Sequence, residues 1–286
     1  MPAPPLRLIT GLREIAVEYD SLICDVWGVL HNGKQAQPAA WEACIRVHES
    51  GKPVILFSNA PRLAGEVRKQ LDRLGVPQVA YDDIVTSGAV TRAELEKRGR
   101  GHTLRLLHIG PERDHGVYQG LNVSMVGADE AELVLCTGFF DDEKETPEDY
   151  RKRFAELIAR KLTLLCVNPD IVVQRGEKLI PCAGALARLY EQMGGQTLYY
   201  GKPHLPIYAA ALTRARDVGR AVRPLVIGDG LETDIKGANA AGLDALFVMD
   251  GIHAGKIPNK SDVAAIAKLL NAKGVTARAA IDALRW

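Results

Sequence analysis

The chain has 286 residues, 47% of them hydrophobic and 25% charged, which is ordinary for a globular protein with one large core or two smaller ones. Its formal net charge of +1 gives no reason to expect nucleic acid or a membrane as a partner, and no apolar run approaches the ~18 residues of a membrane span. Five scattered cysteines without a metal-binding spacing, and an N-terminus without the apolar core of a secretory signal, predict a cytoplasmic protein with reduced thiols.

The first part of the chain predicts helices that alternate with buried strands. We expect a helix over residues 11–19, a strand at 22–26, a helix at 38–50, a strand at 53–57 and a helix from Pro61 to about 74. Glycines follow two of these helices, and Pro61 suits a first helical turn. Successive strand–helix units imply right-handed crossovers, so the sequence predicts a parallel sheet.

The rest of the chain continues this alternation. The middle part predicts helices at 86–98, 146–161 and 181–192, with strands at 103–109, 132–136 and 162–167. An acidic run at 141–145 is typical of a solvated loop. The last part predicts a short strand at 199–200, further strands at 224–227 and 245–249, and helices at 207–217, 235–241, 261–271 and 276–284.

Residues that can do chemistry directly follow the apolar runs. They are Asp25, Ser58, Asn59, Lys202, Asp229 and Asp234. In one parallel sheet they would meet at the carboxyl edge, where ligands bind in such folds. A carboxylate can attack phosphorus, further carboxylates can hold Mg²⁺, and a helix start with a lysine can neutralise phosphate. The pattern therefore indicates phosphoryl transfer.

Each of these residues also has a structural interpretation. Asp25 can cap a turn, and Ser58 or Asn59 can cap the helix that follows. Lys202 can be a solvated surface lysine, and Asp234 can stabilise a helix N-terminus. For Ser58, Asn59 and Asp234 the structural role is compatible with a functional one.

Four motifs in order, DVWGVL at 25–30, SNAPR at 58–62, GKP at 201–203 and GDGLETD at 228–234, resemble those of the haloacid dehalogenase superfamily of hydrolases. The HNG turn at 31–33 and the stretch Asn168-Pro169-Asp170 are similar to its class IIA, or NagD-like, phosphatase group. The resemblance implies an α/β fold with a doubly wound parallel-sheet core at 1–83 and 188–286. It also implies an inserted α/β cap domain at 84–187, which in such proteins often carries dimer contacts, so a homodimer is possible.

The resemblance also implies a role for each site residue. Asp25 matches the nucleophile that takes the phosphoryl group, and Lys202 matches the lysine that bridges nucleophile and phosphate. Ser58, the Asn59 amide and Gly28 match phosphate-binding positions. The Mg²⁺ ligands would be Asp25, the backbone carbonyl of Trp27 and Asp229, with Asp234 a direct ligand or a supporting one.

One departure from the family pattern concerns the acid. The residue two beyond the nucleophile is usually a second Asp, which protonates the leaving group, but here it is Trp27. An indole does no acid–base work at neutral pH, and His31 is a possible substitute. Ala60 also replaces a polar residue that many class IIA members have.

Three functional hypotheses follow. The first is a Mg²⁺-dependent phosphatase that acts on a small phosphorylated metabolite through an aspartyl-phosphate. The second is an enzyme of the same fold with non-phosphatase chemistry. The third is a catalytically weak metabolite-binding or regulatory protein. Trp27 keeps the second and third open.

Overall fold

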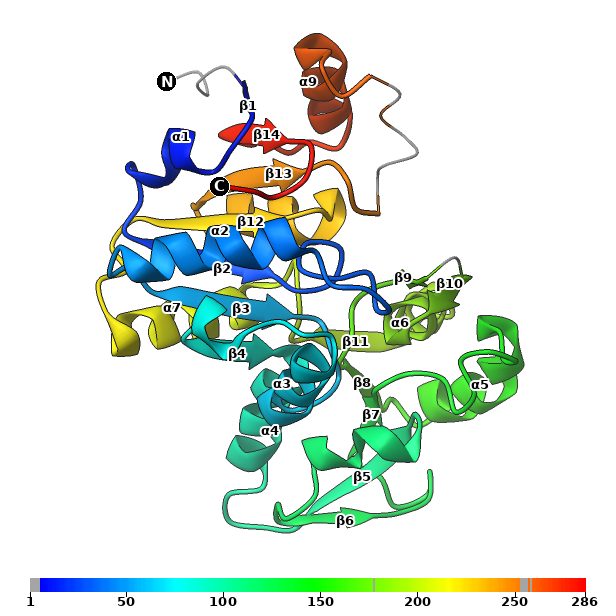
Figure 1. Cartoon of the computed structure of the whole chain (residues 1–286). Coiled ribbons are helices and arrows are strands. Elements are labelled where there is room, and N and C mark those ends of the chain that lie inside the picture. Colours follow the sequence, from blue (N-terminus) through cyan, green and yellow to red (C-terminus); the bar gives the residue numbers. More distant parts are fainter. Residues whose placement is uncertain (1–5, 177, 253–256, 258) are drawn as a thin grey trace.

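The computed structural model describes residues 6–176, 178–252, 257 and 259–286, which form two parallel sheets with helices around them (Figure 1). The larger, core sheet has seven strands in the spatial order β1 (Arg7–Ile9), β14 (Ala279–Ile281), β13 (Asp244–Val248), β12 (Pro224–Gly228), β2 (Ser21–Asp25), β3 (Val54–Ser58) and β4 (Asp83–Thr86). All pairs in it are parallel. The α/β prediction with a doubly wound core is confirmed.

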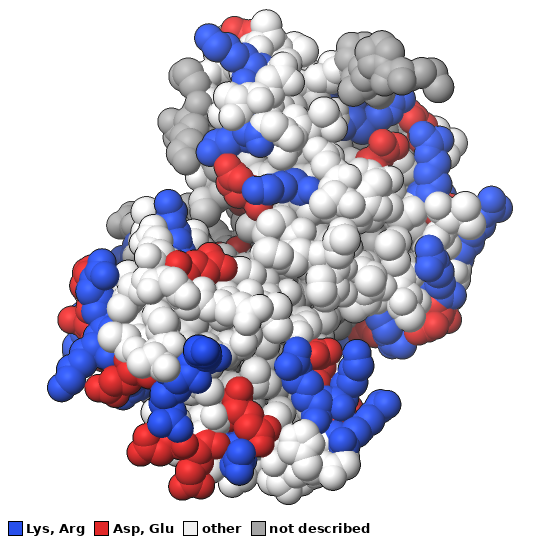
Figure 2. All heavy atoms as spheres, turned by 180° about the vertical axis from the view of Figure 1, so that it is seen from behind, with Lys and Arg blue, Asp and Glu red and all other residues white. Residues whose placement is uncertain are grey.

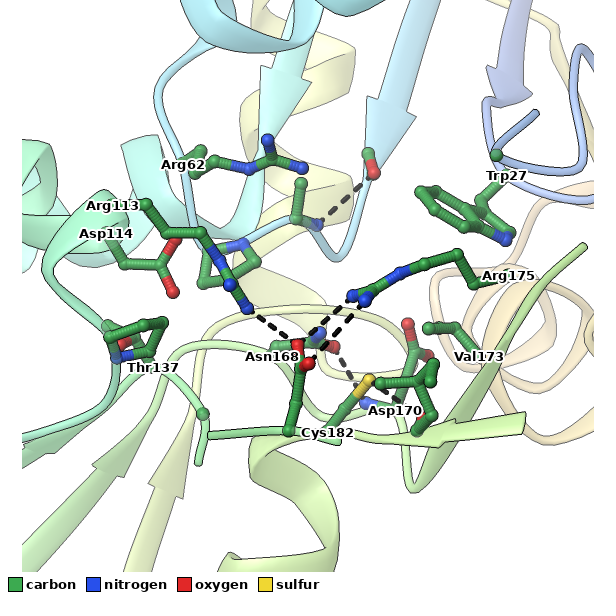
Figure 3. Close-up of a pocket in the computed structure, with 18 of the residues that line it drawn as sticks. Trp27, Arg62, Arg113, Asp114, Thr137, Asn168, Asp170, Val173, Arg175 and Cys182 are labelled. Carbon is green, nitrogen blue, oxygen red and sulfur yellow. Dashed lines mark hydrogen bonds and ion pairs between the residues drawn. The ribbon is translucent and has the colours of Figure 1, made fainter. Parts of the chain in front are cut away.

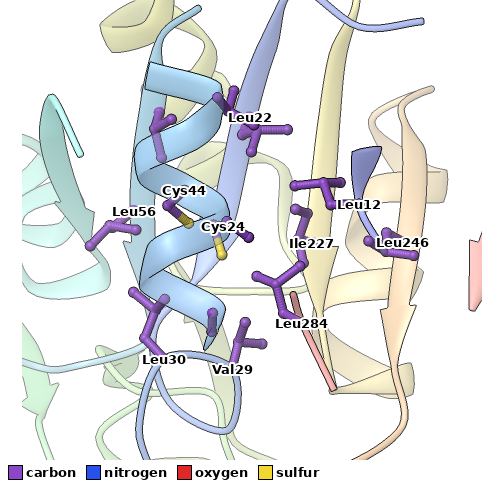
Figure 4. Packing of buried hydrophobic residues seen from close by; sticks show 14 of the residues in the cluster. Leu12, Leu22, Cys24, Val29, Leu30, Cys44, Leu56, Ile227, Leu246 and Leu284 are labelled. Atoms are coloured by element: carbon purple, nitrogen blue, oxygen red, sulfur yellow. The ribbon is translucent and has the colours of Figure 1, made fainter. Parts of the chain in front are cut away.

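Strand β2 lies at the centre of this sheet and is buried along its whole length. Its successive side chains point to opposite faces, so Leu22 and Cys24 enter one hydrophobic cluster and Ile23 enters the other. The cluster drawn in Figure 4 packs under α2 (Pro38–Glu49), where Cys44 lies against Cys24. Burial on both faces explains why the sequence shows an unbroken apolar run there.

Helices cover both faces of the core sheet. The first cluster is covered by α1 (Arg13–Ala16), α2 and α3 (Ala64–Arg73). The second is covered by α7 (Leu205–Val218), the short helix η4 (Leu231–Ile235), α8 (Lys236–Ala240) and α9 (Val263–Ala272). This double cover leaves the carboxyl edge of the sheet as the place where polar side chains gather.

The smaller, cap sheet has five parallel strands in the order β11 (Gln196–Tyr199), β8 (Thr163–Cys166), β7 (Leu133–Cys136), β5 (Leu104–Ile109) and β6 (Val123–Met125). The helices η2 (Glu112–Val117), η3 (Pro147–Tyr150), α5 (Arg151–Ala159) and α6 (Ala183–Gln192) belong to this part. An antiparallel hairpin, β9 (Val172–Arg175) with β10 (Lys178–Pro181), extends from it toward the core (Figure 1).

The two sheets do not end where the predicted domain boundaries lie. Strand β4 lies in the predicted cap except for its first residue, Asp83, but it pairs with β3 of the core. Strand β11 falls within the predicted core but pairs with β8 of the cap. Between the sheets runs α4 (Ser87–Arg98), whose first turn is capped by Thr86. Val90 of this helix packs on the core and Leu95 packs on the cap. Because one continuous helix serves both parts, the sequence shows no change of composition where the core ends and the cap begins.

The prediction of a helix at 276–284 is wrong. Residues Ala279–Ile281 form β14, which is buried between β1 and β13. Alanines favour helices in isolation, but β1 and β13 lie on either side of this short segment and satisfy its backbone hydrogen bonds when it is a strand. The helix expected from Pro61 begins at Ala64, and the short strand expected at 199–200 is β11, which ends at Tyr199.

On the face shown in Figure 2, acidic and basic side chains are interspersed over the surface. None of the helices in the described ranges combines the length and the apolar character needed to cross a membrane.

Candidate active site

The predicted site residues meet at the carboxyl edge of the core sheet. Asp25 is the last residue of β2, Ser58 is the last residue of β3, and Asp229 follows β12 directly. Lys202 arrives by a different route, because it follows β11 of the cap sheet and lies in the segment that returns to the core. The expectation that every site residue follows a strand of one sheet is therefore wrong for Lys202.

The ammonium of Lys202 joins two of the carboxylates. Its Nζ donates to Asp25 Oδ1 at 2.5 Å and to Asp234 Oδ1 at 2.7 Å, and all three side chains are almost fully buried. Burial alone would lower the pKa of Lys202, but Asp234 and Asp25 outweigh it and hold the pKa well above its usual range. Lys202 is therefore a fixed positive charge beside Asp25, and not a solvated surface lysine.

Asn59 holds the segment that carries Lys202. Its Oδ1 accepts from the Lys202 backbone N–H at 2.6 Å, and its Nδ2 donates to the Lys202 carbonyl at 3.1 Å and to Asp170 Oδ1 at 2.9 Å. Ser58 Oγ accepts from the Ala60 N–H at 3.2 Å. Neither residue caps α3, which starts at Ala64, so the capping interpretation is wrong and Asn59 instead ties core to cap.

Three buried carboxylates, those of Asp25, Asp229 and Asp234, each offer an oxygen, and these oxygens lie within 4.8 Å of one another. The ammonium of Lys202 bonds two of them, so the cluster has more carboxylates than ammonium groups bonded to it. Burial and the adjacent Asp234 raise the pKa of Asp25 well above its usual range and that of Asp229 to about 7. Such an excess in an all-oxygen donor set fits a hard divalent cation such as Mg²⁺.

Two glycines make room for the Asp229 carboxylate. A Cβ at Gly28 or at Gly251 would overlap Asp229, and Gly28 also has a φ of +93°, which side chains rarely allow. The Ile252 N–H donates to Asp229 Oδ2 at 2.7 Å. Both oxygens of Asp234 accept protein hydrogen bonds, from Lys202 and from the Gly230 N–H, so Asp234 also positions Lys202.

Trp27 links the core to the cap. Its Nε1 donates to the Gln174 carbonyl of β9 at 2.7 Å, so the indole at the position of the usual acid is a contact between domains. His31 is buried, its Nδ1 accepts from the Gly33 N–H at 2.9 Å, and burial together with Arg62 lowers its pKa to about 4. A histidine that stays neutral above that pH has no readily lost proton to donate, which argues against His31 as the substitute acid.

Two adjoining cavities open at this edge. One, of about 270 Å³, contains Asp25, Lys202, Asp229 and Asp234 in its wall. The other, of about 430 Å³, extends between core and cap. Residues shared by both walls are Trp27, Ser58, Asp170 and Val173.

Sequence reasoning missed most of the wider cavity. The sequence predicts a solvated loop around Asp142, but the Asp142 carboxylate is mostly buried and accepts from Arg113 and Arg175. Figure 3 labels both arginines in the cavity wall. Asp142 lies on a loop, Arg113 in the short helix η2 and Arg175 on strand β9 of the hairpin, and none of these segments has a periodic signal. The Asn168-Pro169-Asp170 stretch was a usable signal, since Asp170 bonds Asn59.

Comparison with known proteins agrees with this site. A family model for haloacid dehalogenase-like hydrolases matches residues 22–124, and a second HAD-hydrolase-like model matches residues 199–276. A solved haloacid dehalogenase-like hydrolase from Brucella suis 1330 is 44% identical, with a TM-score of 0.85 over 97% of this chain and 100% of that one. The chain therefore belongs to the haloacid dehalogenase-like hydrolase family.

Two further relatives narrow the group. The ribonucleotide monophosphatase NagD of Escherichia coli (strain K12) is 26% identical over 235 residues, 81% of this chain and 88% of that protein. The glycerol phosphate phosphatase Rv1692 of Mycobacterium tuberculosis, solved in complex with magnesium, is 25% identical with a TM-score of 0.65, over 83% of this chain and 70% of that one. Within the family, the chain falls in the NagD-like, class IIA group.

Proposed function

We propose that this protein is a cytoplasmic, Mg²⁺-dependent phosphatase that hydrolyses a small phosphorylated metabolite through an aspartyl-phosphate on Asp25. The observation that carries the proposal is the buried contact of Asp25 with Lys202 beside Asp229, at the wall of a cavity. The phosphatase names of the similar proteins, and the magnesium complex of one of them, support it.

In the first step, a carboxylate oxygen of Asp25 attacks phosphorus and the bond from phosphorus to the ester oxygen breaks. Lys202 holds the Asp25 carboxylate in place and offsets the charge on the phosphoryl oxygens. The Ser58 hydroxyl and the backbone N–H groups after it bind those oxygens. Gly28 has no side chain, so the backbone there can come close to the phosphate. In the second step, water attacks the phosphorus, inorganic phosphate leaves and Asp25 is restored.

A Mg²⁺ ion held by Asp25, Asp229 and the Trp27 carbonyl, with Asp234 beside it, would neutralise phosphate charge in this site. The residues do the rest of the positioning. Asn59 fixes the Lys202 segment, and Asp234 fixes the ammonium itself.

The position of the usual acid delivers no proton to the leaving oxygen here, because Trp27 donates its N–H to Gln174 and an indole does not ionise at neutral pH. Esters whose leaving group needs no proton, such as aryl or acyl phosphates, are therefore the better substrates. Because Trp27 supplies no acid, it also favours a second candidate function, that of a metabolite-binding protein with little turnover.

The experiment is a panel of aryl, acyl and alkyl phosphates, each assayed with Mg²⁺ and with a chelator. Turnover that needs Mg²⁺ supports the phosphatase. Tight binding of phosphorylated compounds without turnover of any ester contradicts it and favours the binding protein.

A further inference from the structure

The wider cavity between core and cap is lined by four arginines. Arg62 and Arg73 come from the core, and Arg113 and Arg175 come from the cap. A cavity of about 430 Å³ is larger than a single phosphate needs. Its position beside the Asp25 cavity makes it the natural place for the rest of a substrate.

Positive charge in this cavity is only partly balanced. Asp142 accepts from Arg113 Nη2 at 2.6 Å and from Arg175 Nη2 at 3.1 Å, and Arg175 also lies 3.9 Å from the exposed carboxylate of Glu143. Figure 3 labels both arginines. Within the described part of the chain, Arg62 pairs with no carboxylate, and its guanidinium reaches the Gln70 amide at 3.4 Å.

The charged groups around Arg62 leave it with unbalanced positive charge. Burial lowers its pKa, and the nearby guanidiniums of Arg113 and Arg175 act in the same direction while Asp114 opposes them. A half-buried guanidinium without a carboxylate partner can bind an anion by donating two parallel hydrogen bonds to it.

The wall between the cavities is common to both, since Ser58 and Asp170 belong to each. A molecule whose phosphate lies at Asp25 can therefore continue past these residues into the arginine cavity. Apolar side chains there, among them Val173 and Ile180, contact a carbon spacer without competing for the charge.

We propose that the arginine cavity binds a second anionic group of the substrate, so that the preferred substrates are phosphate monoesters with a carboxylate or a second phosphate at the far end. The inference rests on the proposed phosphatase function, because it places the reacting phosphate at Asp25. Arg62, Arg113 and Arg175 are the residues that bind the second group. Removal of one charged partner from such a contact typically weakens binding about tenfold to a hundredfold.

The experiment compares matched esters that differ at the far end. Carboxyphenyl phosphate and phenylene bisphosphate are each set against phenyl phosphate, so that every ester has an aryl leaving group, with p-nitrophenyl phosphate as a further reference without a second anion. We expect kcat/KM to be at least about tenfold higher for the member with two anions. The carboxylate and phosphate pairs separate the two kinds of second group.

The variants are Arg62→Gln, Arg113→Gln and Arg175→Gln. Each should raise KM for the two-anion esters about tenfold or more and leave p-nitrophenyl phosphate within about twofold. Arg105→Gln is the matched control, because Arg105 lies on the cap with 53% of its side chain exposed, close to the 55% of Arg113, but outside the cavity wall. An equal loss for all substrates in the cavity variants would mean that these arginines only maintain the structure.

Failure of the inference differs from failure of the proposed function. Turnover of p-nitrophenyl phosphate without a preference for two anions overturns the inference and leaves the phosphatase standing. If no ester is hydrolysed, the inference is tested by comparing how much fructose bisphosphate and fructose monophosphate raise the unfolding temperature of the protein. A preference for the bisphosphate that the Arg175→Gln variant loses supports the inference, and equal stabilisation overturns it.

Discussion

The core and cap sides of the cleft hold their charges in different ways. On the core side, the side chains of Asp25, Lys202 and Asp234 are 5% exposed or less and are bonded to one another. On the cap side, the side chains of Arg113 and Arg175 are 55% and 37% exposed; both contact Asp142, and Arg175 also contacts Glu143. The core side is fixed before any ligand arrives, whereas the cap side can adjust to one.

This difference separates chemistry from selectivity. Buried charges that need no reorganisation stabilise the charge that develops during a reaction. Half-exposed arginines lose side-chain freedom when they bind a ligand, so each contact contributes less to affinity, but their side chains adapt to different ligands. We therefore expect core substitutions to affect every substrate and cap substitutions to affect some.

The largest expected effect is that of Asp25→Asn. The amide has the shape of the carboxylate but does not attack phosphorus, so kcat on p-nitrophenyl phosphate should fall by at least about 10³-fold. The fold should be retained, since one of three crowded carboxylates is neutralised. Asp129→Asn, on a side chain 95% exposed in the cap, is the control and should change nothing. Comparable activity in both variants would remove Asp25 from the chemistry.

Next in size is the effect of Trp27→Asp, which restores an acid at the boundary between the two sides. A positioned general acid contributes about 10²–10⁴-fold, so kcat/KM for alkyl phosphates should rise by about 10² while aryl phosphates change little. Trp27→Phe is the control, because it loses the same hydrogen bond to Gln174 without adding an acid. A wild type that already hydrolyses alkyl esters as fast as aryl esters would contradict the missing-acid argument.

A stability measurement tests the cap side separately. Asp114 is buried beside Arg113, its Oδ1 has no hydrogen-bond partner among the described residues, and burial raises its pKa to about 6. Unfolded, this carboxyl titrates near pH 4, so the folded state holds the extra proton between about pH 4 and 6. The stability this proton gives is complete below pH 4 and is lost as the pH rises through 6.

Asp114→Asn should therefore be more stable than wild type at pH 7, by up to about 3 kcal/mol, and equal to it near pH 4. Chemical denaturation at both pH values measures this difference. The exposed Asp129→Asn variant should follow wild type. Parallel pH profiles for wild type and Asp114→Asn would show that Asp114 is ionised without cost.

The contrast between the core side and the cap side also explains which site residues the sequence predicts. Asp25, Ser58 and Asp229 could be identified because each follows an apolar run, and buried parallel strands both produce such runs and aim their ends at one edge. Lys202 could be identified by its motif but not by its place, since it returns from a cap strand. The family motifs predict that Gly28 and Asn59 bind phosphate, but their contacts with Asp229 and Lys202 depend on the folded arrangement and not on the motifs.

The cap side could not be predicted in this way. Asp142 and Arg175 meet because a loop and a hairpin fold toward each other, and neither segment has a period that fixes a direction. The sequence predicts a solvated loop for an acidic run whenever the basic residues that pair with it lie far away in the chain. The strand β14 was missed for a related reason, because its two partner strands, and not its own residues, decide its conformation.

The smallest expected effect concerns the metal and belongs to the core side alone. Mg²⁺ at about ten times its Kd should stabilise wild type by about 1.4 kcal/mol, since a ligand that binds the folded state adds RT ln(1 + [L]/Kd). Asp229→Asn removes one of the three clustered carboxylates and should lose most of this stabilisation. The cap variant Arg175→Gln should keep this stabilisation, because Arg175 contacts Asp142 and Glu143 and none of the three carboxylates. Thermal unfolding with Mg²⁺ and with a chelator measures each case, and equal stabilisation of wild type and Asp229→Asn would exclude Asp229 as a ligand.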